Sequence, residues 1–240
     1  MIVSPPFTNP RSRCGYLPDR DWRLEHRIAH EITIDEYAAL ILQGWRHFGR
    51  TLFRPRCRGC DACRAIRIDV DRFRPDRSQR RAFKGNESDL RLVIAEPVAD
   101  APQLNLYHRY HAHMAEAKQW PDRQDEDLFE YRDSFVDNPF EVQEWRYYLG
   151  ETLVGVGYVD PLPIGPSAIT FLHDPDHLDR SLGTFNVLAL IDQARQLGQP
   201  HVYLGYYVAG CPSLAYKARF ATNQTLDPDG LWRDFHIRNS

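Results

Sequence analysis

The sequence predicts an α+β fold in which a mostly antiparallel mixed sheet is flanked by helices. The first observation is a run of three strand patterns with short connections between residues 142 and 173. The second is a helical spacing of apolar residues over 182–197, followed at once by another strand pattern. With 240 residues, of which 42% are hydrophobic, the chain can bury a substantial core.

Local signals define the elements of the first half. Thr33 and Glu36 have the spacing of a capping box, in which two side chains satisfy free N–H groups at a helix start. Apolar residues then recur on one helical face, and the helix is expected to end between residues 44 and 49. Residues 65–70 alternate between apolar and polar and predict a half-buried strand. The Arg-rich stretch 72–86 is expected to be a surface loop or an exposed helix.

The pattern changes in the second half. Helical spacing runs from Leu104 to Val136 with a break at Trp120-Pro121, and strand patterns begin beyond Asn138-Pro139. We therefore divide the chain into an N-terminal region, 1–138, and a C-terminal region, 139–240. The second region is predicted to contain strands over 142–149, 152–159 and 167–173, a helix over 182–197 and a strand over 201–208. Gly150-Glu151 is a hairpin connection between the first two strands.

Charge is segregated along the chain. Residues 46–91 contain 14 Lys and Arg against 6 Asp and Glu, although the whole chain has a formal net charge of −3. Clustered cations favour a polyanion as a partner, and RNA phosphates are the expected one. No apolar run is long enough to cross a bilayer and no secretory signal pattern begins the chain, so the sequence predicts a cytoplasmic protein with no membrane partner.

Three cysteines follow one another closely inside this basic stretch, in Cys57-Arg-Gly-Cys60-Asp-Ala-Cys63. Such crowding, with an odd total of five, favours reduced thiols over a disulfide framework. With Cys14 added from a distance, four thiolates could hold a zinc ion or a [4Fe-4S] cluster. The alternative is no cofactor, with reduced cysteines packing a tight loop.

The order strand, strand, strand, helix, strand resembles the central part of the GNAT acyltransferase fold, so the C-terminal region is expected to be GNAT-like. The turn Arg180-Ser-Leu-Gly183-Thr-Phe185 resembles the loop with which acetyltransferases hold the pyrophosphate of coenzyme A at a helix N-terminus. Phe185 departs from that pattern because a small residue is usual there. A coenzyme A dependent N-acetyltransferase is therefore an alternative, and another acyl donor is favoured.

Several motifs together resemble the aminoacyl-tRNA:protein transferase family, of the bacterial aspartate/glutamate leucyltransferase type. These motifs are Cys14-Gly-Tyr-Leu17, the cysteine array, Arg180-Ser-Leu-Gly-Thr184, Tyr203-Leu-Gly-Tyr-Tyr207 and Tyr216-Lys217. The resemblance implies transfer of leucine from leucyl-tRNA onto proteins that begin with Asp or Glu, which enters them into an N-degron pathway. An arginyl-tRNA:protein transferase and a non-enzymatic metal and RNA-binding protein also stay open as interpretations, and no DNA partner is expected.

A tRNA aminoacyl ester is already activated, so we expect the acceptor amine to attack it directly without an enzyme nucleophile. We expect the hydroxyls of Tyr206 and Tyr207 to contact the ester. We expect Asp174 or Asp176 to position the acceptor amine or to relay its proton. The structural alternatives are sheet packing for the two tyrosines and a turn cap for the two carboxylates.

An acceptor that begins with Asp or Glu needs a cation to hold its carboxylate. Lys217 is the first choice, with Arg146 and Arg219 in reserve, and the turn residues Arg180, Gly183 and Thr184 are expected to contact substrate. The tRNA is expected to lie on a set of cations for which a solvated surface is the alternative. These cations are Arg54, Arg56, Arg58, Arg77, Arg80, Arg81 and Lys84.

Overall fold

A computed structural model of the protein describes residues 1–118, 120, 121 and 123–235. Its largest element is an eight-stranded sheet with the order β15-β14-β8-β13-β12-β11-β10-β9. The strands are β8 (Arg64–Asp69), β9 (Leu90–Ala95), β10 (Gln143–Leu149), β11 (Thr152–Asp160), β12 (Ser167–His173), β13 (His201–Tyr207), β14 (Asn223–Leu226) and β15 (Trp232–Asp234). All neighbours pair antiparallel except β12 and β13, which confirms the predicted fold class.

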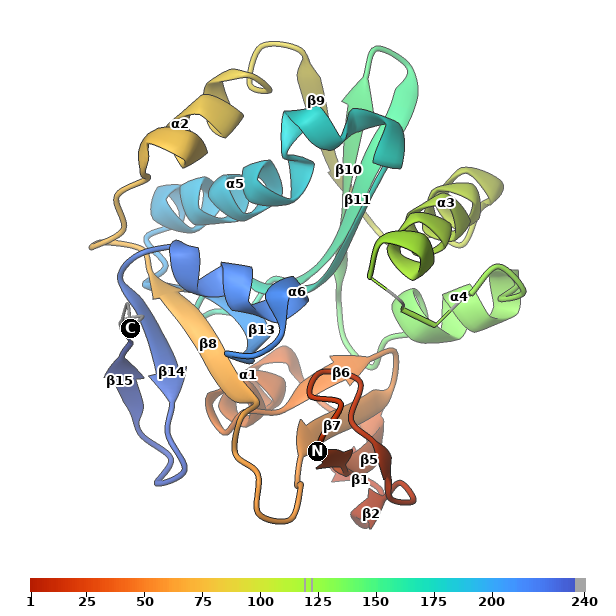
Figure 1. The fold of residues 1–240 in the computed structure, drawn as a ribbon, viewed down its shortest axis with the longest axis vertical. Helices are drawn as coiled ribbons and strands as arrows, with labels where there is room; N and C mark the ends of the chain where they lie inside the picture. The colour runs from red at the N-terminus through yellow and green to blue at the C-terminus, as the bar shows by residue number, and fades with distance from the viewer. Residues whose placement is uncertain (119, 122, 236–240) are drawn as a thin grey trace.

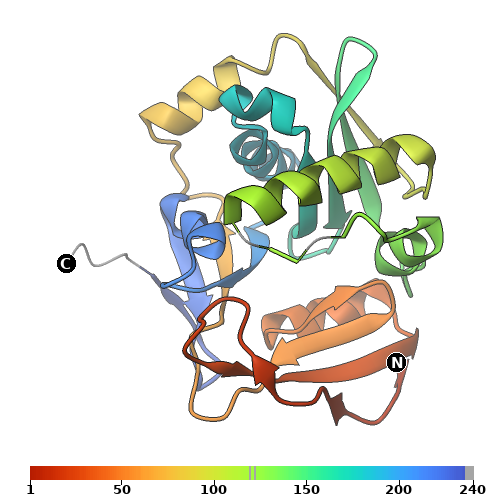
Figure 2. The same ribbon diagram turned by 45° about the vertical axis from the view of Figure 1, so that its right-hand side comes forward.

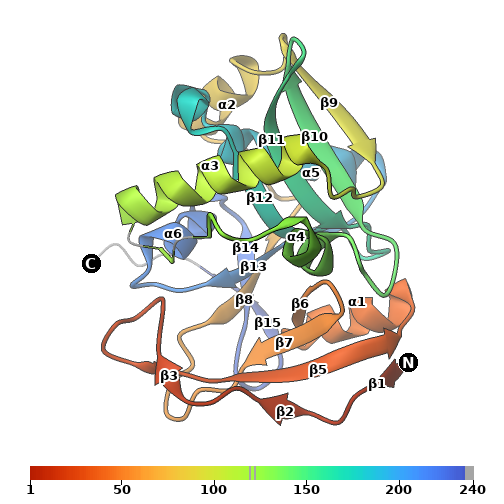
Figure 3. The same ribbon diagram turned by 90° about the vertical axis from the view of Figure 1, so that its right-hand side faces the viewer.

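Helices cover both faces of this sheet (Figure 1). α2 (Arg77–Lys84) and α5 (Leu182–Gln196) lie on one side of β10 and β11, and α3 (Ala101–Lys118) and α4 (Leu128–Phe135) lie on the other. In Figure 3, α3 crosses in front of the sheet. One core joins the sheet to α5 around Trp145, Ile191 and Val202, and another joins it to α3 and α4 around Tyr131 and Tyr158.

The chain between β12 and β14 folds into short helical segments around α5 and β13. They are η1 (Pro175–Arg180), before α5, and α6 (Pro212–Ala215) and η2 (Tyr216–Arg219), after β13. The predicted strands and helix of 142–208 are confirmed, with bounds that differ by no more than a residue or so. Gly150 turns the β10–β11 hairpin with a φ of 59°, which glycine adopts without steric cost.

A second, smaller sheet is built from the first 55 residues, where the sequence patterns predict no strand. It has the order β1-β5-β7-β6, with β2 also paired to β5. Its elements are β1 (Ile2–Val3), β2 (Phe7–Thr8), β5 (Leu24–Glu31), α1 (Ile34–Leu42), β6 (Arg46–Phe48) and β7 (Thr51–Pro55), beside the separate ribbon of β3 (Ser12–Arg13) and β4 (Asp21–Trp22). The capping box of Thr33 and Glu36 at α1 is confirmed. Figure 2 shows this sheet at one end of the molecule.

The predicted boundary at residue 139 does not separate the two sheets. β8 and β9 belong to the N-terminal region by sequence, yet they pair with β13, β14 and β10 in the central sheet. The reason is that the partners of β8, which are β13 and β14, come much later in the chain, beyond residue 200. The alternation of apolar and polar residues in β8 does not indicate which strands it pairs with. The compact N-terminal unit is therefore the smaller sheet with α1.

Three contacts hold the smaller sheet against the central sheet and α4. His47 Nε2 lies 2.8 Å from Asp160 Oδ1, with both side chains fully buried. The Tyr206 hydroxyl donates to Gly44 O at 2.6 Å. Gly49 N donates to Ser134 O of α4 at 2.8 Å. Within the described residues, no helix is long and apolar enough to cross a membrane.

Candidate active site

β12 and β13 separate from each other after a single register pair, Ser167 with Tyr203. β13 is also irregular where it pairs with β8, between Tyr203 and Tyr206, and Gly205 there has a φ of 73°. Such a conformation favours glycine, and the irregularity turns the end of β13 away from β12. Two neighbouring parallel strands therefore open like a wedge toward their C-terminal ends.

A cavity of about 330 Å³ lies beside the open ends of these strands. It is lined by Asp76, Ser78 and Gln79 at the start of α2, by His173 and Leu178 after β12, by Ser181, Leu182, Gly183 and Thr184 at the start of α5, and by Tyr216, Arg219 and Phe220. Ser181 has left-handed backbone angles and gives α5 no side-chain cap. The N–H of Thr184 donates to Ser181 O at 2.9 Å, so the N–H groups of Leu182 and Gly183 are the ones suited to bind an anion or another acceptor at this cavity.

The structure brings together three of the predicted substrate-binding residues and separates two others. Gly183, Thr184 and Arg219 line the cavity. Arg180 forms an ion pair with Asp89 at 2.8 Å, so the turn is braced by its guanidinium. Arg146 lies on β10 and pairs with a fully buried carboxylate 2.6 Å away, and it does not line the cavity.

Phe185 does not obstruct the start of α5. Its ring is buried and packs against Phe83 and Tyr147, with centroid distances of 5.5 and 5.9 Å. The side chain points into the core, because position 185 faces the sheet one turn into the helix. The departure at Phe185 from the coenzyme A pattern is therefore a side chain of the core that does not cover the turn.

Asp174 and Asp176 are both bound by Arg109 of α3. Arg109 donates to the two oxygens of Asp174 at 2.9 and 2.6 Å and to Asp176 at 2.8 Å. Asp174 is buried and also accepts from the backbone N–H of Asp176, which caps η1. This arrangement is the turn cap that the sequence offered as the alternative to a catalytic role.

We expect Asp174→Asn to destabilise the protein by about 2 kcal/mol, because it removes the charge from a buried, bidentate ion pair while keeping the side-chain shape. Urea unfolding followed by circular dichroism measures this. Asp176→Asn is the matched control, since that carboxylate is largely exposed, and its cost should be within about 0.5 kcal/mol. A stable Asp174→Asn protein that no longer turns over would instead assign Asp174 to the chemistry.

The two predicted tyrosines are buried in β13. The Tyr206 hydroxyl is held by Gly44 O, and burial raises the pKa of Tyr206 well above its usual range. Tyr207 packs against Phe235 with a centroid distance of 4.9 Å. Both side chains join layers of the fold, as the sheet-packing alternative predicts, and the backbone of this strand is what faces the wedge.

Lys217 extends back from η2 to this backbone. Its Nζ donates to Tyr206 O at 3.0 Å. Burial, with a contribution from Arg46, lowers the pKa of Lys217 to about 7. Its neighbour in the chain, Tyr216, lines the cavity, whereas the Lys217 amine itself lies at the backbone of β13. A lysine poised between its charged and neutral forms near pH 7 is suited to bind a carboxylate or to accept a proton.

His173 is a cavity residue that the sequence patterns did not single out. Its Nδ1 is buried without a hydrogen-bond partner, and its ring stacks on Phe171 with a centroid distance of 6.0 Å. Burial, helped by His113 and Lys118, lowers the pKa of His173 to about 4, so the ring is neutral at pH 7. The sequence signal that could have identified His173 as a site residue is its position immediately before the Asp174-Pro-Asp176 turn.

The predicted tRNA-binding cations form two groups. Arg77, Arg80, Arg81 and Lys84 lie on α2, beside the cavity. The other three lie at the opposite end of the molecule, Arg54 on β7 and Arg56 and Arg58 in the segment that follows it (Figures 1 and 3). Arg54 and Arg56 share Glu25 as a partner, at 2.8 and 3.0 Å. The α2 group is the one next to the open end of α5.

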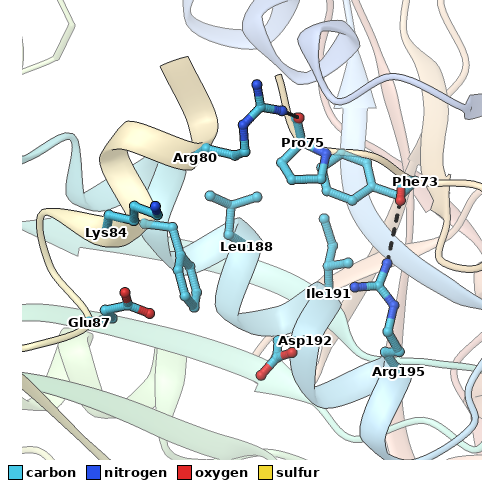
Figure 4. Close-up of a pocket in the computed structure, with 10 residues that line it drawn as sticks. Phe73, Pro75, Arg80, Lys84, Glu87, Leu188, Ile191, Asp192 and Arg195 are labelled. Carbon is cyan, nitrogen blue, oxygen red and sulfur yellow. Dashed lines mark hydrogen bonds between the residues drawn. The ribbon is translucent and has the colours of Figure 1, made fainter. Parts of the chain in front are cut away.

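A second cavity of about 360 Å³ separates α2 from α5 (Figure 4). Its floor is apolar and includes Leu188 and Ile191 of α5, and its rim carries Arg80 and Lys84 of α2. None of the predicted reactive groups lines it. It extends the cationic surface of α2 away from the first cavity.

The cysteines gather without forming a ligand set. Burial first, and then the thiols of Cys14, Cys57, Cys60 and Cys211, raise the pKa of Cys63 to about 12. Cys57 Sγ instead accepts from the backbone N–H of Arg23 at 3.3 Å. Among the residues that the structure describes, no group of three His, Cys, Asp or Glu side chains is arranged to hold a metal ion. The thiols as placed do not fit zinc or a cluster.

The cysteine loops nevertheless lie close to the candidate site. Cys211 is buried after β13, and its thiol acts on the pKa of Lys217. A Cβ added to Gly210 would lie 2.8 Å from Leu17, so the Cys14 loop packs against the end of β13. This brings the N-terminal motif to the C-terminal site, which the sequence could not place in space.

The opened strands, the uncapped start of α5 and the buried amine of Lys217 are an arrangement suited to acyl transfer. The chain belongs to the arginine-tRNA-protein transferase family: it matches the N terminus of that family over residues 12–81 and the C terminus over residues 102–227. It is an aminoacyltransferase.

The relatives of this chain include proteins named aspartate/glutamate leucyltransferase. One from Campylobacter jejuni strain 81116 is 35% identical, with 92% of each chain covered. Another, from Halorhodospira halophila, is also 35% identical with 92% of each chain covered. Among solved structures, L-PGS from Bacillus licheniformis matches 66% of this chain and 52% of its own, with 11% identity and a TM-score of 0.44.

Proposed function

We propose that the protein transfers leucine from leucyl-tRNA onto the N-terminal Asp or Glu of other proteins, which marks them for N-degron degradation. The names of the relatives support leucine as the amino acid that is moved. The observation that supports an acidic acceptor is Lys217, whose buried amine is held at Tyr206 O of β13 and whose neighbour in the chain, Tyr216, lines the cavity. A cation in that position suits the carboxylate of an acidic N-terminal residue.

The chemistry requires positioning more than a reactive side chain. The neutral α-amine of the acceptor attacks the carbonyl carbon of the leucyl ester, a C–N bond forms, and the C–O bond to the ribose breaks. The amine gives up one proton and the ribose oxygen takes one. The enzyme supplies proximity and stabilises the developing oxyanion, for which backbone N–H groups at the wedge and at the start of α5 are suited.

The tRNA is best accommodated along α2. Arg77, Arg80, Arg81 and Lys84 give this eight-residue helix four cations, and residues at its start line the cavity. Phosphate contacts of this kind follow the shape of the acceptor stem and carry little sequence information. The second group, around Arg54, would contact a more distant part of the tRNA. We place the reaction in the cytoplasm, where charged tRNA is available.

A transfer assay tests the proposal directly. Purified protein is incubated with radiolabelled leucyl-tRNA or arginyl-tRNA and with peptides that begin with Asp, Glu, Asn or Gln. We expect leucine to appear on the Asp and Glu peptides, and at least tenfold less on their amide counterparts, because the buried amine has no charged partner there. Arginine transfer would assign the other donor. No transfer from either tRNA, with acetylation from acetyl-CoA, would replace the proposal with the acetyltransferase alternative.

A further inference from the structure

Arg46, at the start of β6, is a buried cation that the sequence did not single out. It is only 5% exposed. Its guanidinium donates to two backbone carbonyls, Trp45 O at 2.6 Å and Gly205 O at 3.2 Å, and its Nε has no hydrogen-bond partner. Its carbon Cζ also lies 5.5 Å from the centre of the Tyr206 ring. These contacts direct the group at the irregular part of β13.

Lys217 also contacts this part of β13. It follows β13 in the chain, whereas Arg46 precedes it. Arg46 donates to Gly205 O, and Lys217 donates to the next carbonyl, Tyr206 O. The charge of Arg46 helps to lower the pKa of Lys217, which agrees with the closeness of the two groups. Two cations thus meet at adjacent peptide units of one strand.

Neither of these cations forms an ion pair with a carboxylate in the part of the chain that the structure describes. Other partly buried arginines are paired: Arg146 with Glu144, and Arg109 with Asp174. Burying a cation without an opposite charge costs several kcal/mol, and carbonyl hydrogen bonds offset only part of that cost. An arrangement of this kind is stabilised when an anion binds.

The position that a side chain at residue 205 would take lies beside Lys217 and is not filled by other atoms. Gly205 has no side chain, and a Cβ added to it would meet a single atom within 4 Å, Lys217 Nζ at 3.6 Å. The space over this residue is otherwise open, and the left-handed backbone there favours glycine. The wedge between β12 and β13 begins two residues earlier, after Tyr203.

We propose that Arg46 and Lys217 together bind the side-chain carboxylate of the acceptor's N-terminal Asp or Glu in the space over Gly205. This inference rests on the proposed function and assigns its acceptor specificity to a pair of residues from the two sheets. Lys217 supplies a point charge, and Arg46 supplies a directed N–H group that is unpartnered in the free protein.

A carboxylate is favoured over a tRNA phosphate at this position. Arg46 is buried, whereas phosphodiesters are bound by exposed cations such as those of α2. A small, planar carboxylate fits two donors on adjacent peptide units. The acceptor's α-amine, three bonds from the carboxyl carbon in Asp and four in Glu, would then lie at the wedge where the ester must be placed.

The test measures peptide binding without tRNA, so that it does not depend on turnover. Isothermal titration calorimetry compares the full-length protein with Arg46→Gln, using peptides that differ only in an N-terminal Asp or Asn. We expect the wild type to prefer the Asp peptide by roughly 30-fold or more, and Arg46→Gln to lose at least tenfold of that preference. Arg46→Lys should restore part of it.

Arg50→Gln is the matched control. Arg50 lies in the same hairpin and also donates only to backbone carbonyls, of Ala29 and His30, but it is exposed at the far side. It should leave the preference unchanged. Thermal melting confirms that each variant is folded, and if Arg46→Gln is unfolded, the Arg46→Lys protein alone must show a reduced preference.

Several outcomes would overturn the inference. One is a wild type that binds Asp and Asn peptides equally, and another is an Arg46→Gln protein that keeps its preference. If Arg46→Gln raises the KM for charged tRNA and leaves peptide binding intact, the cation serves a phosphate instead. A wild type that prefers the Asp peptide but transfers no amino acid would contradict the proposed function and leave this inference standing.

Discussion

Replacement of Lys217 by Met is expected to lower kcat/KM for peptides that begin with Asp or Glu by roughly 30-fold or more, which corresponds to about 2 kcal/mol. The substitution keeps the length of the side chain and removes the charge that would meet the acceptor's carboxylate. Most of the loss should appear in the KM for the peptide, with the KM for leucyl-tRNA unchanged. Lys217→Arg should retain part of the activity because it retains a cation.

The stability of Lys217→Met separates a functional loss from a structural one. Burial disfavours the charged form of Lys217, which is why its pKa falls to about 7. The folded protein therefore binds this proton less tightly than the unfolded chain, and the lysine opposes folding at neutral and acidic pH. We expect Lys217→Met to be at least as stable as the wild type. A marked drop in melting temperature would contradict this expectation.

The same pKa sets a pH dependence. Below about pH 7 the amine is charged and holds the carboxylate, and as the pH rises above 7 the free protein loses that charge. The ratio of kcat/KM between Asp and Asn peptides should therefore fall with rising pH, by up to about tenfold per unit. The ratio cancels the titration of the acceptor's own α-amine, which both peptides share. A flat ratio between pH 6 and 9 would show that Lys217 does not hold the carboxylate.

Replacement of Gly49 by Ala is expected to destabilise the protein by about 4 kcal/mol. Gly49 turns the β6–β7 hairpin with a φ of 50°, and an added Cβ would lie 1.9 Å from the carbonyl oxygen of Asp133 in α4. Backbone on both sides must move, so the smaller sheet would be pushed away from α4. Since Arg46 lies in the same hairpin, acceptor preference should fall together with stability.

Gly150→Ala is the control for backbone strain alone. Gly150 has a similar φ of 59° in the β10–β11 hairpin, but an added Cβ would meet no atom within 4 Å. Its cost should be about 1 kcal/mol. Urea unfolding of both variants gives the difference, which measures the clash. An equal loss of unfolding free energy in the two variants would mean that the contact between Gly49 and α4 rearranges at little cost.

Elements that depend on short-range patterns could be predicted from the sequence. The three antiparallel strands up to His173 alternate apolar and polar residues or form buried runs, and the α5 helix has an apolar face that recurs with helical spacing. The capping box at Thr33 pairs residues only three apart. Such signals depend only on residues that are close in the sequence, so they can be recognised without knowledge of the rest of the fold.

The strands before residue 56 could not be predicted in this way. β5 carries His26, Arg27 and His30 among its apolar residues, and β1 and β2 are two residues long. Their pairing comes from tertiary contacts, which override weak local preference. The structural roles of Asp174 and Tyr206 are hidden from the sequence for the same reason, since the partners that occupy them, Arg109 and Gly44, are distant in the chain.

The sequence by itself determined the family and the order of strands and helix in the C-terminal half, and it predicted that Lys217 and the turn at Gly183 belong to one site. Only the tertiary structure decided what surrounds them. Arg46 and Lys217 meet at Gly205 because the smaller sheet packs against β13, while the cations of α2 and β7 lie far apart. Contacts between distant segments depend on how whole layers pack, and local periodicity carries no information about that.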